Sequence, residues 1–332
     1  MSAPSMTAVV ARRYGPPESV EVDRLPVPAP GAGQVLVRVE AAGVGRGVLH
    51  LLTGTPFLVR LAGFGVRRPK QPVVGLEASG VVEAVGEGVT RFVVGDAVFG
   101  YVSGGYADLA IGEEAKLAKR PAGVSAVDAA TSVDSASTAL QAVRDHGEVQ
   151  AGDRVLVLGA SGGVGSFAAQ VATSLGAKVT GTARTSKLDF VRSLGVADVV
   201  DHATSDPLDL DGAQPYDVII DTGGLNPLRR LRRALAADGT LVLVGGEGGG
   251  PIAGGFHRQL LAPLRQIGTR QRLRTFIAKE SHETLDQLGS MVADGTLRPP
   301  VDRVHPLARA VDALARLEAG EICGKDAIAV AA

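Results

Sequence analysis

Hydrophobic and polar positions change their pattern along this chain. Up to about residue 120, the apolar residues occur in short runs separated by turns that contain Gly and Pro. Residues 35–41 alternate apolar and polar positions, 78–85 combine small and β-branched residues, and 95–99 follow a turn. Such runs are typical of β-strands. The pattern therefore predicts a β-rich N-terminal part.

From about residue 126, short apolar runs alternate with helical spacing. The runs predict strands at 154–158, 178–182, 198–200, 217–221 and 240–244, with helices between them. This alternation indicates an α/β fold with a doubly wound parallel sheet of the Rossmann type.

Beyond about residue 275 the pattern returns to shorter elements. It predicts a helix at 281–294, an extended segment at 301–305, a helix at 307–319 and a last strand, which we expect to rejoin the N-terminal part. The prediction is two domains. Residues 1–125 and 275–332 form a β-rich domain, and 126–274 form an α/β domain.

The strand at 154–158 runs directly into a glycine-rich turn and then into helical spacing. Gly162 allows the backbone to approach a pyrophosphate, and Gly165 allows the helix to pack on the strand. The helix N-terminus directs N–H groups at the negative charge. Such a fingerprint is weak alone, and a glycine turn that binds nothing is the alternative; the flanking strand and helix favour the dinucleotide site. The residues expected to contact the cofactor here are Ser161, Gly162, Gly163, Val164 and Gly165.

The end of the next strand indicates which dinucleotide binds. NAD sites usually place an acid there to hold the ribose hydroxyls, but this chain has Ala183. Arg184, Ser186 and Lys187 follow and could bind a 2′-phosphate, so we expect NADPH. The alternative is that Arg184 and Lys187 are merely solvated cations at the start of a helix.

Composition excludes several classes of function. The 332 residues carry a net charge of −1, which gives no electrostatic footprint for nucleic acid or an anionic membrane. No apolar run approaches the roughly 20 residues that span a bilayer. The single cysteine, Cys323, excludes an intrachain disulfide and a thiolate-rich metal site. We expect a cytoplasmic protein that acts on a small molecule.

With these parts in this order, the chain resembles the medium-chain dehydrogenase/reductase superfamily, in its zinc-free quinone oxidoreductase-like branch. The matching motifs are Gly43-Val44, Gly75-Leu76-Glu77, Gly86 with Gly88, Gly95-Asp96-Ala97-Val98, Gly104-Gly105-Tyr106-Ala107, Thr138 to Ala142, Ala160 to Gly165 and Asp221 to Gly224. The resemblance implies that the β-rich domain has a GroES-like fold and is the catalytic domain, that residues 126–274 form the Rossmann NADP-binding domain, and that the protein is a homodimer. It also implies that Thr138 contacts the cofactor and that Gly223, Gly245 and Gly246 hold its nicotinamide half.

Zinc alcohol dehydrogenases of this superfamily bind the metal through two cysteines and a histidine. The resemblance places Gly45, Leu76 and Asp134 at these positions. Gly and Leu have no donor atom, and a catalytic zinc needs three protein ligands. Without a Lewis acid, the favoured acceptors are already electron-poor, such as quinones and α,β-unsaturated carbonyls. We therefore expect no metal and an NADPH-dependent reductase of such substrates.

Asp134 is the candidate acid of the reaction. If it stands near the nicotinamide, burial raises its pKa and makes it a general acid. A carboxylate that stays ionised favours the oxidised cofactor instead, which opposes a reductase. A helix N-cap or a solvated loop acid is the alternative.

Arg46 and His50 lie where some zinc dehydrogenases place a pyrophosphate-binding arginine and a proton-relay histidine. Both residue types suit that chemistry. The hydroxyl-bearing residue and the acid of the relay are replaced by Gly47 and Val48, however, so the relay is broken at its inner end. His50 is thus either a site residue or a structural histidine.

Two further questions stay open from the sequence. Residues 57–70 are apolar and basic, which fits a flap beside the substrate cleft or a surface helix with solvated arginines.

Two other functions also fit the scaffold: a non-redox cyclase or isomerase with Asp134 as acid–base, and a binding protein that responds to the nucleotide without turnover.

Overall fold

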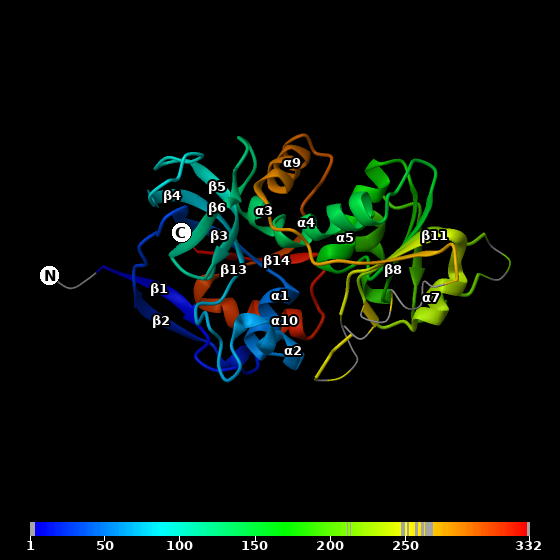
Figure 1. The fold of residues 1–332 in the computed structure, drawn as a ribbon, viewed down its shortest axis with the longest axis horizontal. Helices are drawn as coiled ribbons and strands as arrows, with labels where there is room; N and C mark the ends of the chain where they lie inside the picture. The colour runs from blue at the N-terminus through cyan, green and yellow to red at the C-terminus, as the bar shows by residue number, and fades with distance from the viewer. Residues whose placement is uncertain are drawn as a thin grey trace. The chain divides into compact units, whose positions relative to one another are not determined.

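The computed structural model describes residues 4–210, 212, 214–246, 250, 252–255, 258–259, 262 and 268–330. It divides into two compact units (Figure 1), the first made of Met1–Ser137 and Glu280–Ala332 and the second of Thr138–Lys279. The division falls later than the predicted boundaries at 125 and 275. Helix α3 (Ala126–Thr131) accounts for the difference at the first boundary, because it packs on strands β3 (Gln34–Val44) and β4 (Glu77–Val85) of the first unit.

The first unit is built on a sheet that closes on itself. Its strand order is β13 (Val301–Pro306), β14 (Lys325–Ala329), β3, β4, β5 (Ala97–Ser103) and β6 (Leu109–Lys119), and β3 also pairs with β6. Strand β14 runs antiparallel to β3, with Asp326 opposite Val44. The last strand of the chain therefore lies beside the segment that leads into the candidate site.

The remaining elements of the first unit surround this sheet. Strands β1 (Ser5–Val10) and β2 (Glu21–Pro26) form an antiparallel pair. The helices are α1 (Arg46–Thr53), α2 (Phe57–Val59), α3, the start of α4 (Asp134–Leu140), α9 (His282–Ala293) and α10 (Ala310–Glu318).

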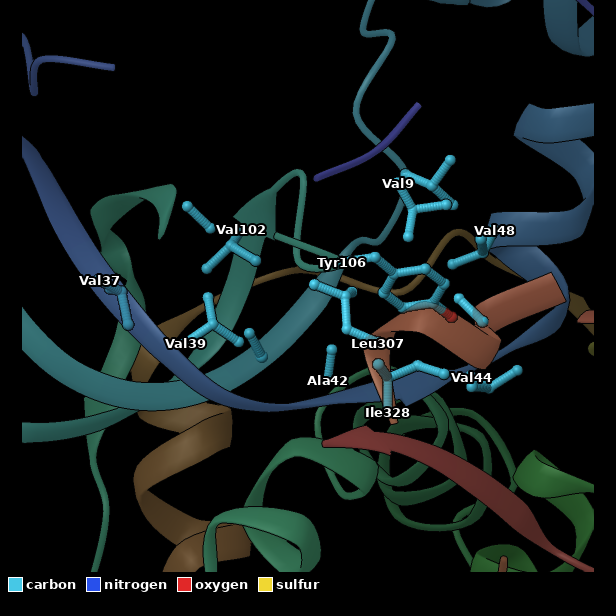
Figure 2. Packing of buried hydrophobic residues seen from close by; sticks show 14 of the residues in the cluster. Val9, Val37, Val39, Ala42, Val44, Val48, Val102, Tyr106, Leu307 and Ile328 are labelled. Atoms are coloured by element: carbon cyan, nitrogen blue, oxygen red, sulfur yellow. The ribbon is translucent and has the colours of Figure 1, made fainter. Parts of the chain in front are cut away.

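Apolar side chains from both ends of the chain share the core of the first unit. Figure 2 shows Val9, Val39 and Val44 around Tyr106, with Leu307 and Ile328 from the C-terminal segment beside them. Tyr106 is fully buried, and its hydroxyl donates a hydrogen bond to the carbonyl oxygen of Gly43 at 3.1 Å. This packing fixes the segment around Gly43 and Gly45.

The second unit contains a parallel sheet. Its strand order is β12 (Arg272–Thr275), β11 (Leu235–Leu243), β10 (Tyr216–Asp221), β7 (Arg154–Leu158), β8 (Lys178–Ala183) and β9 (Asp198–Asp201). Helices α5 (Gly163–Ser174), α6 (Leu188–Ser193) and α7 (Leu228–Ala234) belong to the same unit.

The predicted Rossmann sheet is confirmed, and β12 adds a strand that the pattern did not predict. Strand order reverses between β7 and β10, which are neighbours in the sheet. In open parallel sheets, ligands bind in the crevice outside the carboxyl ends of the strands at such a point. A bound dinucleotide is therefore expected at this edge of the sheet.

Candidate active site

The glycine-rich turn follows the carboxyl end of β7. Gly162 caps the N-terminus of α5 with an extended backbone, and Gly159 has a φ of +80°. A Cβ at Gly165 would lie 2.1 Å from the carbonyl oxygen of Gly159, so the tight contact between turn and helix requires glycine there. Ser161, Gly163 and Val164 keep part of their surface accessible. The first turn of α5 thus presents backbone N–H groups at the switch point, as an anionic pyrophosphate requires.

The end of β8 carries the residues predicted to bind a 2′-phosphate. Arg184 and Ser186 are exposed, and Lys187 is partly buried. Thr185 lies between them in the sequence, and its hydroxyl donates a hydrogen bond of 2.5 Å to the carboxylate of Asp201. We call Arg184, Ser186, Lys187 and Asp201 the phosphate rim.

Asp201 is a functional candidate that the sequence reasoning missed. It is the last residue of β9 and pairs in register with Ala183, the position where an acid was sought. Hydrogen bonds from the Thr185 hydroxyl and the Ala203 backbone hold the pKa of its carboxyl below the usual range. A carboxylate therefore lies at this rim on the adjacent strand.

Glycines also gather at the carboxyl ends of β10 and β11. A Cβ at Gly245 would lie 2.1 Å from the carbonyl oxygen of Thr222, so the two loops touch through their backbones. Gly223, Gly245 and Gly246 all keep part of their surface accessible. The predicted contacts for the nicotinamide half thus meet at one sheet edge, whereas Thr138 lies on α4 at the start of the second unit. Its contact with the cofactor stays a prediction.

Three ionisable residues of the first unit form a group that we call the ion cluster; two of them are buried and the third, Asp134, is partly buried. Asp134 begins α4, and its backbone N–H donates to Glu77 Oε2 at 2.7 Å. The other oxygen, Oε1, accepts a hydrogen bond of 2.5 Å from Lys325 Nζ. Glu77 and Lys325 are each only 1 % exposed. They begin β4 and β14, the two strands that flank β3, so the sheet brings distant segments together.

The surroundings of Asp134 favour its protonated form. Burial and the neighbouring charge of Glu77 raise the pKa of Asp134 to about 6, although the Lys325 ammonium acts in the opposite direction. Burial, followed by the charge of Asp134, also raises the pKa of the Tyr101 hydroxyl. An acid with a pKa near neutrality can both hold and release a proton under physiological conditions.

Gly45 adjoins the ion cluster at the position of a zinc ligand in related enzymes. A Cβ at Gly45 would lie 3.2 Å from Lys325 Nζ and 3.9 Å from Asp134 Oδ2. Leu76, at the second such position, precedes Glu77 and is partly buried. Two of the three positions therefore carry no donor atom, and the group next to Gly45 is an ammonium. Lys325 was missed by the sequence reasoning, although a lysine at the start of an apolar strand was a visible signal.

Helix α1 carries both Arg46 and His50. Gly45 is its N-cap, and Arg46 is exposed in the first turn. His50 lies in the last turn, with Nδ1 2.8 Å from the carbonyl oxygen of Thr55. This contact suits a structural histidine. A role in the site for either residue stays a prediction.

The predicted flap is a short α2 followed by a helical turn at Arg60–Phe64. Five large apolar side chains are exposed between residues 57 and 70: Phe57, Leu58, Leu61, Phe64 and Val66. Arg60 holds the segment, because its guanidinium stacks 4.2 Å from the Tyr14 ring centroid and donates to the Gly54 carbonyl oxygen.

Within the described ranges, no single helix is long and apolar enough to cross a membrane; one pair, Arg46–Thr53 with Phe57–Phe64, meets the length and composition together but is bent by 84°.

Two protein-family models match the chain. Residues 31–124 match the alcohol dehydrogenase GroES-like domain, and residues 194–328 match the zinc-binding dehydrogenase family. The quinone oxidoreductase of Sus scrofa is 31% identical over 93% of this chain and 92% of its own length.

Solved structures agree in fold over nearly the whole chain. A quinone oxidoreductase from Coxiella burnetii superposes with a TM-score of 0.85 at 26% identity, covering 99% of this chain and 100% of that one. A mycobacterial protein in complex with NADPH superposes with a TM-score of 0.83 at 26% identity, covering 98% and 100%. The β-rich unit, the Rossmann sheet and these relatives lead to one conclusion: the chain belongs to the medium-chain dehydrogenase/reductase superfamily, in its quinone oxidoreductase-like branch, and is an oxidoreductase.

Proposed function

We propose that this protein is an NADPH-dependent, zinc-independent reductase that transfers hydride to a quinone or an α,β-unsaturated carbonyl compound. The observation that carries the proposal is the ion cluster, in which Asp134 has a pKa of about 6 beside the donor-free Gly45. This arrangement provides a proton rather than a metal at the position where zinc dehydrogenases bind their metal.

The residue types support zinc independence. A catalytic zinc needs three protein ligands and an open position, and Gly45 and Leu76 contribute none. Elsewhere in the described part of the chain, no three His, Cys, Asp or Glu side chains gather in a way that could hold a metal ion. These residue types support a member of this family that works without the zinc named in the description of the family.

The second unit fits a nicotinamide dinucleotide. The turn at Gly162–Gly165 offers N–H groups for the pyrophosphate, and Arg184, Ser186 and Lys187 offer donors for a 2′-phosphate. The NADPH complex of a structural relative supports the same cofactor. Asp201 opposes it in part, since a carboxylate repels a 2′-phosphate. When bound, the reduced cofactor supplies the hydride.

Asp134 completes the proposed reaction by supplying the proton. Hydride addition to an enone or quinone leaves an electron pair on carbon or oxygen, and Asp134 donates its proton to that atom. Its carboxylate then takes a proton from solvent. Lys325 offsets the charge that forms, because the cluster passes from one carboxylate and one ammonium to two carboxylates and one ammonium. A polar group with a pKa near the working pH is suited to such a transfer.

The decisive experiment follows NADPH oxidation at 340 nm with a panel of quinones and enones, with metal content measured on the same sample. The proposal expects turnover at substoichiometric zinc and no loss of activity with a chelator. Product formation without NADPH oxidation would instead indicate a cyclase or isomerase. Binding of NADPH without any product would indicate a protein that only responds to the nucleotide. Either result would overturn the proposed reaction.

A further inference from the structure

The predicted flap leaves large apolar side chains on the surface of the first unit. Phe57, Leu58 and Leu61 have the spacing of neighbours on one helical face. Phe64 and Val66 follow directly in the chain, and the exposed fractions of the five residues lie between 38% and 58%. Single exposed apolar residues are ordinary, but a group of five within so short a segment marks a surface that contacts something other than water.

The same segment carries positive charge and no negative charge. Arg67, Arg68 and Lys70 are exposed, and no acid in the described part of the chain pairs with them. Residues 41–76 contain no Asp or Glu, but they contain Arg46, Arg60, Arg67, Arg68 and Lys70. The net charge of −1 is an average over the whole chain. It therefore conceals a local excess of cations beside the apolar group.

The backbone brings the apolar and the basic residues into one turn. The N–H of Lys70 donates to the carbonyl oxygen of Phe64 at 2.8 Å, and the Tyr14 hydroxyl donates to that of Gly65 at 2.5 Å. Gly65 has a φ of +109°, and a Cβ there would lie 2.2 Å from the carbonyl oxygen of Arg68. The turn is thus tight and held at both ends. We call its exposed side chains the flap face: Phe57, Leu58, Leu61, Phe64, Val66, Arg67, Arg68 and Lys70.

A groove of about 680 Å³ lies between this turn and the strands β1 and β2. Val10 and Leu25 give it apolar walls, and the three cations of the flap face line it from the other side. Arg12 also lines the groove, but Glu21 and Asp23 offset its charge. The flap-face cations therefore give the groove its net positive charge, which suits a phosphate that is attached to an apolar body.

Charge and apolar area together select the occupant of the flap face. A soluble phosphate or a nucleic acid would neutralise the cations but leave the apolar side chains in water. A second copy docked through the same face would bring like charges together, because a two-fold interface places the same patch on both sides. The surface of an anionic lipid bilayer offers phosphates and an apolar layer side by side.

We propose that the flap face docks this protein on the surface of an anionic lipid bilayer. The apolar side chains enter the boundary between headgroups and acyl chains, and Arg67, Arg68 and Lys70 contact the lipid phosphates. Arg60 instead holds the segment from inside, because its guanidinium stacks on Tyr14. The inference does not rest on the proposed reaction, and its test needs no substrate.

The first test sediments the unmodified protein with two kinds of vesicle. One contains equal parts of phosphatidylglycerol and phosphatidylcholine, and the other contains phosphatidylcholine alone. We expect binding to the anionic vesicles in 0.1 M salt, and binding at least 10-fold weaker to the neutral ones. In 0.5 M salt the difference should shrink, because salt screens the lipid charge.

The second test removes the cations. A triple variant with Arg67→Gln, Arg68→Gln and Lys70→Gln should bind the anionic vesicles about 100-fold more weakly, since each cation near such a surface contributes about 5-fold. The matched control removes three other exposed cations of the same unit, by Arg38→Gln, Lys119→Gln and Arg309→Gln. It should stay within about 3-fold of the unmodified protein.

The third test removes apolar area. Leu61→Gln combined with Phe64→Gln should weaken binding to the anionic vesicles about 10-fold or more. Val93→Gln combined with Val94→Gln is the control, because these residues of the same unit are 65% and 63% exposed. It should stay within about 2-fold.

Several results would overturn the inference. One is no binding of the unmodified protein to anionic vesicles, and another is equal loss in a variant and its control. Inorganic phosphate that binds at the three cations without any vesicle binding would assign the groove to a soluble anion. A lower molecular mass of the Leu61 and Phe64 variant in solution would assign the face to a second copy. A raised KM of that variant with unchanged vesicle binding would assign it to the substrate.

Discussion

The ion cluster of the first unit and the phosphate rim of the second unit differ in how far their charged groups are exposed to solvent. Glu77 and Lys325 are almost completely buried, and their charges act at short range where water cannot screen them. Arg184 and Ser186 of the rim are exposed, so solvent and salt weaken their fields. In the proposed function, the buried charges of the cluster raise the pKa of the acid that supplies the proton, whereas the exposed rim selects the charge of the ligand.

The largest effect should come from breaking the buried pair. Lys325→Met leaves Glu77 charged and buried without its cation, which should cost about 3–5 kcal/mol of unfolding free energy, measured by urea denaturation. Lys119→Met is the matched control, because Lys119 pairs with Asp96 while 60% exposed, and should cost at most about 1 kcal/mol. Similar losses for both variants would remove the distinction between buried and exposed charge.

The next effect concerns the proton itself. Asp134→Asn should lower kcat for enone reduction about 100-fold, because Asn cannot donate the proton. In the unmodified enzyme, kcat should fall as the pH rises through about 6, where Asp134 loses its proton. The variant should lack this pH dependence. An unchanged pH profile in the variant would assign the titration to another group.

Asp134→Asn should lower activity but raise the stability of the folded protein at neutral pH. Because the pKa of Asp134 is raised from 3.8 to about 6 in the folded protein, the folded state binds more protons than the unfolded state between these values. Stability of the unmodified protein therefore falls as the pH rises from about 4 to about 6. At pH 7, Asp134→Asn should be more stable by about 1–3 kcal/mol. Asp189→Asn, at a fully exposed side chain, should show no such change.

A smaller effect is expected at the phosphate rim. Lys187→Ala should weaken NADPH about 10- to 100-fold and leave NADH unchanged, since a charge-assisted contact to a phosphate is worth about 1.5–3 kcal/mol. Lys178→Ala, at the opposite end of β8, is the control and should alter neither affinity. Equal weakening of both cofactors by Lys187→Ala would contradict the 2′-phosphate assignment.

The smallest effect should come from Asp201. Asp201→Asn removes a negative charge at the rim, so NADPH should bind about 2- to 5-fold more tightly relative to NADH. The gain should shrink in 0.5 M salt, because exposed charges are screened. Asp198→Asn, at the start of β9, serves as the control. A shift toward NADH would mean that Asp201 does not face the 2′ position.

Much of the second unit could be predicted from its sequence because its information is local. The glycine turn lies within a dozen residues that include the apolar run of β7, Gly162 and Gly165. The structural requirement of each of these can be recognised from its neighbours in the sequence. The same holds for Arg184 and Lys187, which follow β8 directly. Asp201 could not be found in this way, because it reaches Ala183 only through the pairing of β8 with β9.

The ion cluster illustrates the opposite case. Asp134 was a candidate from the resemblance, and a raised pKa was expected if it were buried, but its partners did not follow from neighbouring residues. Glu77 and Lys325 are separated by most of the chain and meet because β4 and β14 both flank β3.

The sequence by itself determined most of the strands and helices of the second unit, the glycine turn and the residue types at the positions where the resemblance expects zinc ligands. The periodicity of apolar residues and the steric requirements of a turn depend on residues that are close together in the sequence, so the sequence alone can reveal them. Tertiary structure alone decided which charges are buried together, that Asp134 holds its proton to about pH 6, and that an acid joins the phosphate rim. These properties depend on desolvation and on distances of a few ångströms between segments far apart in the chain, which only the folded sheets establish.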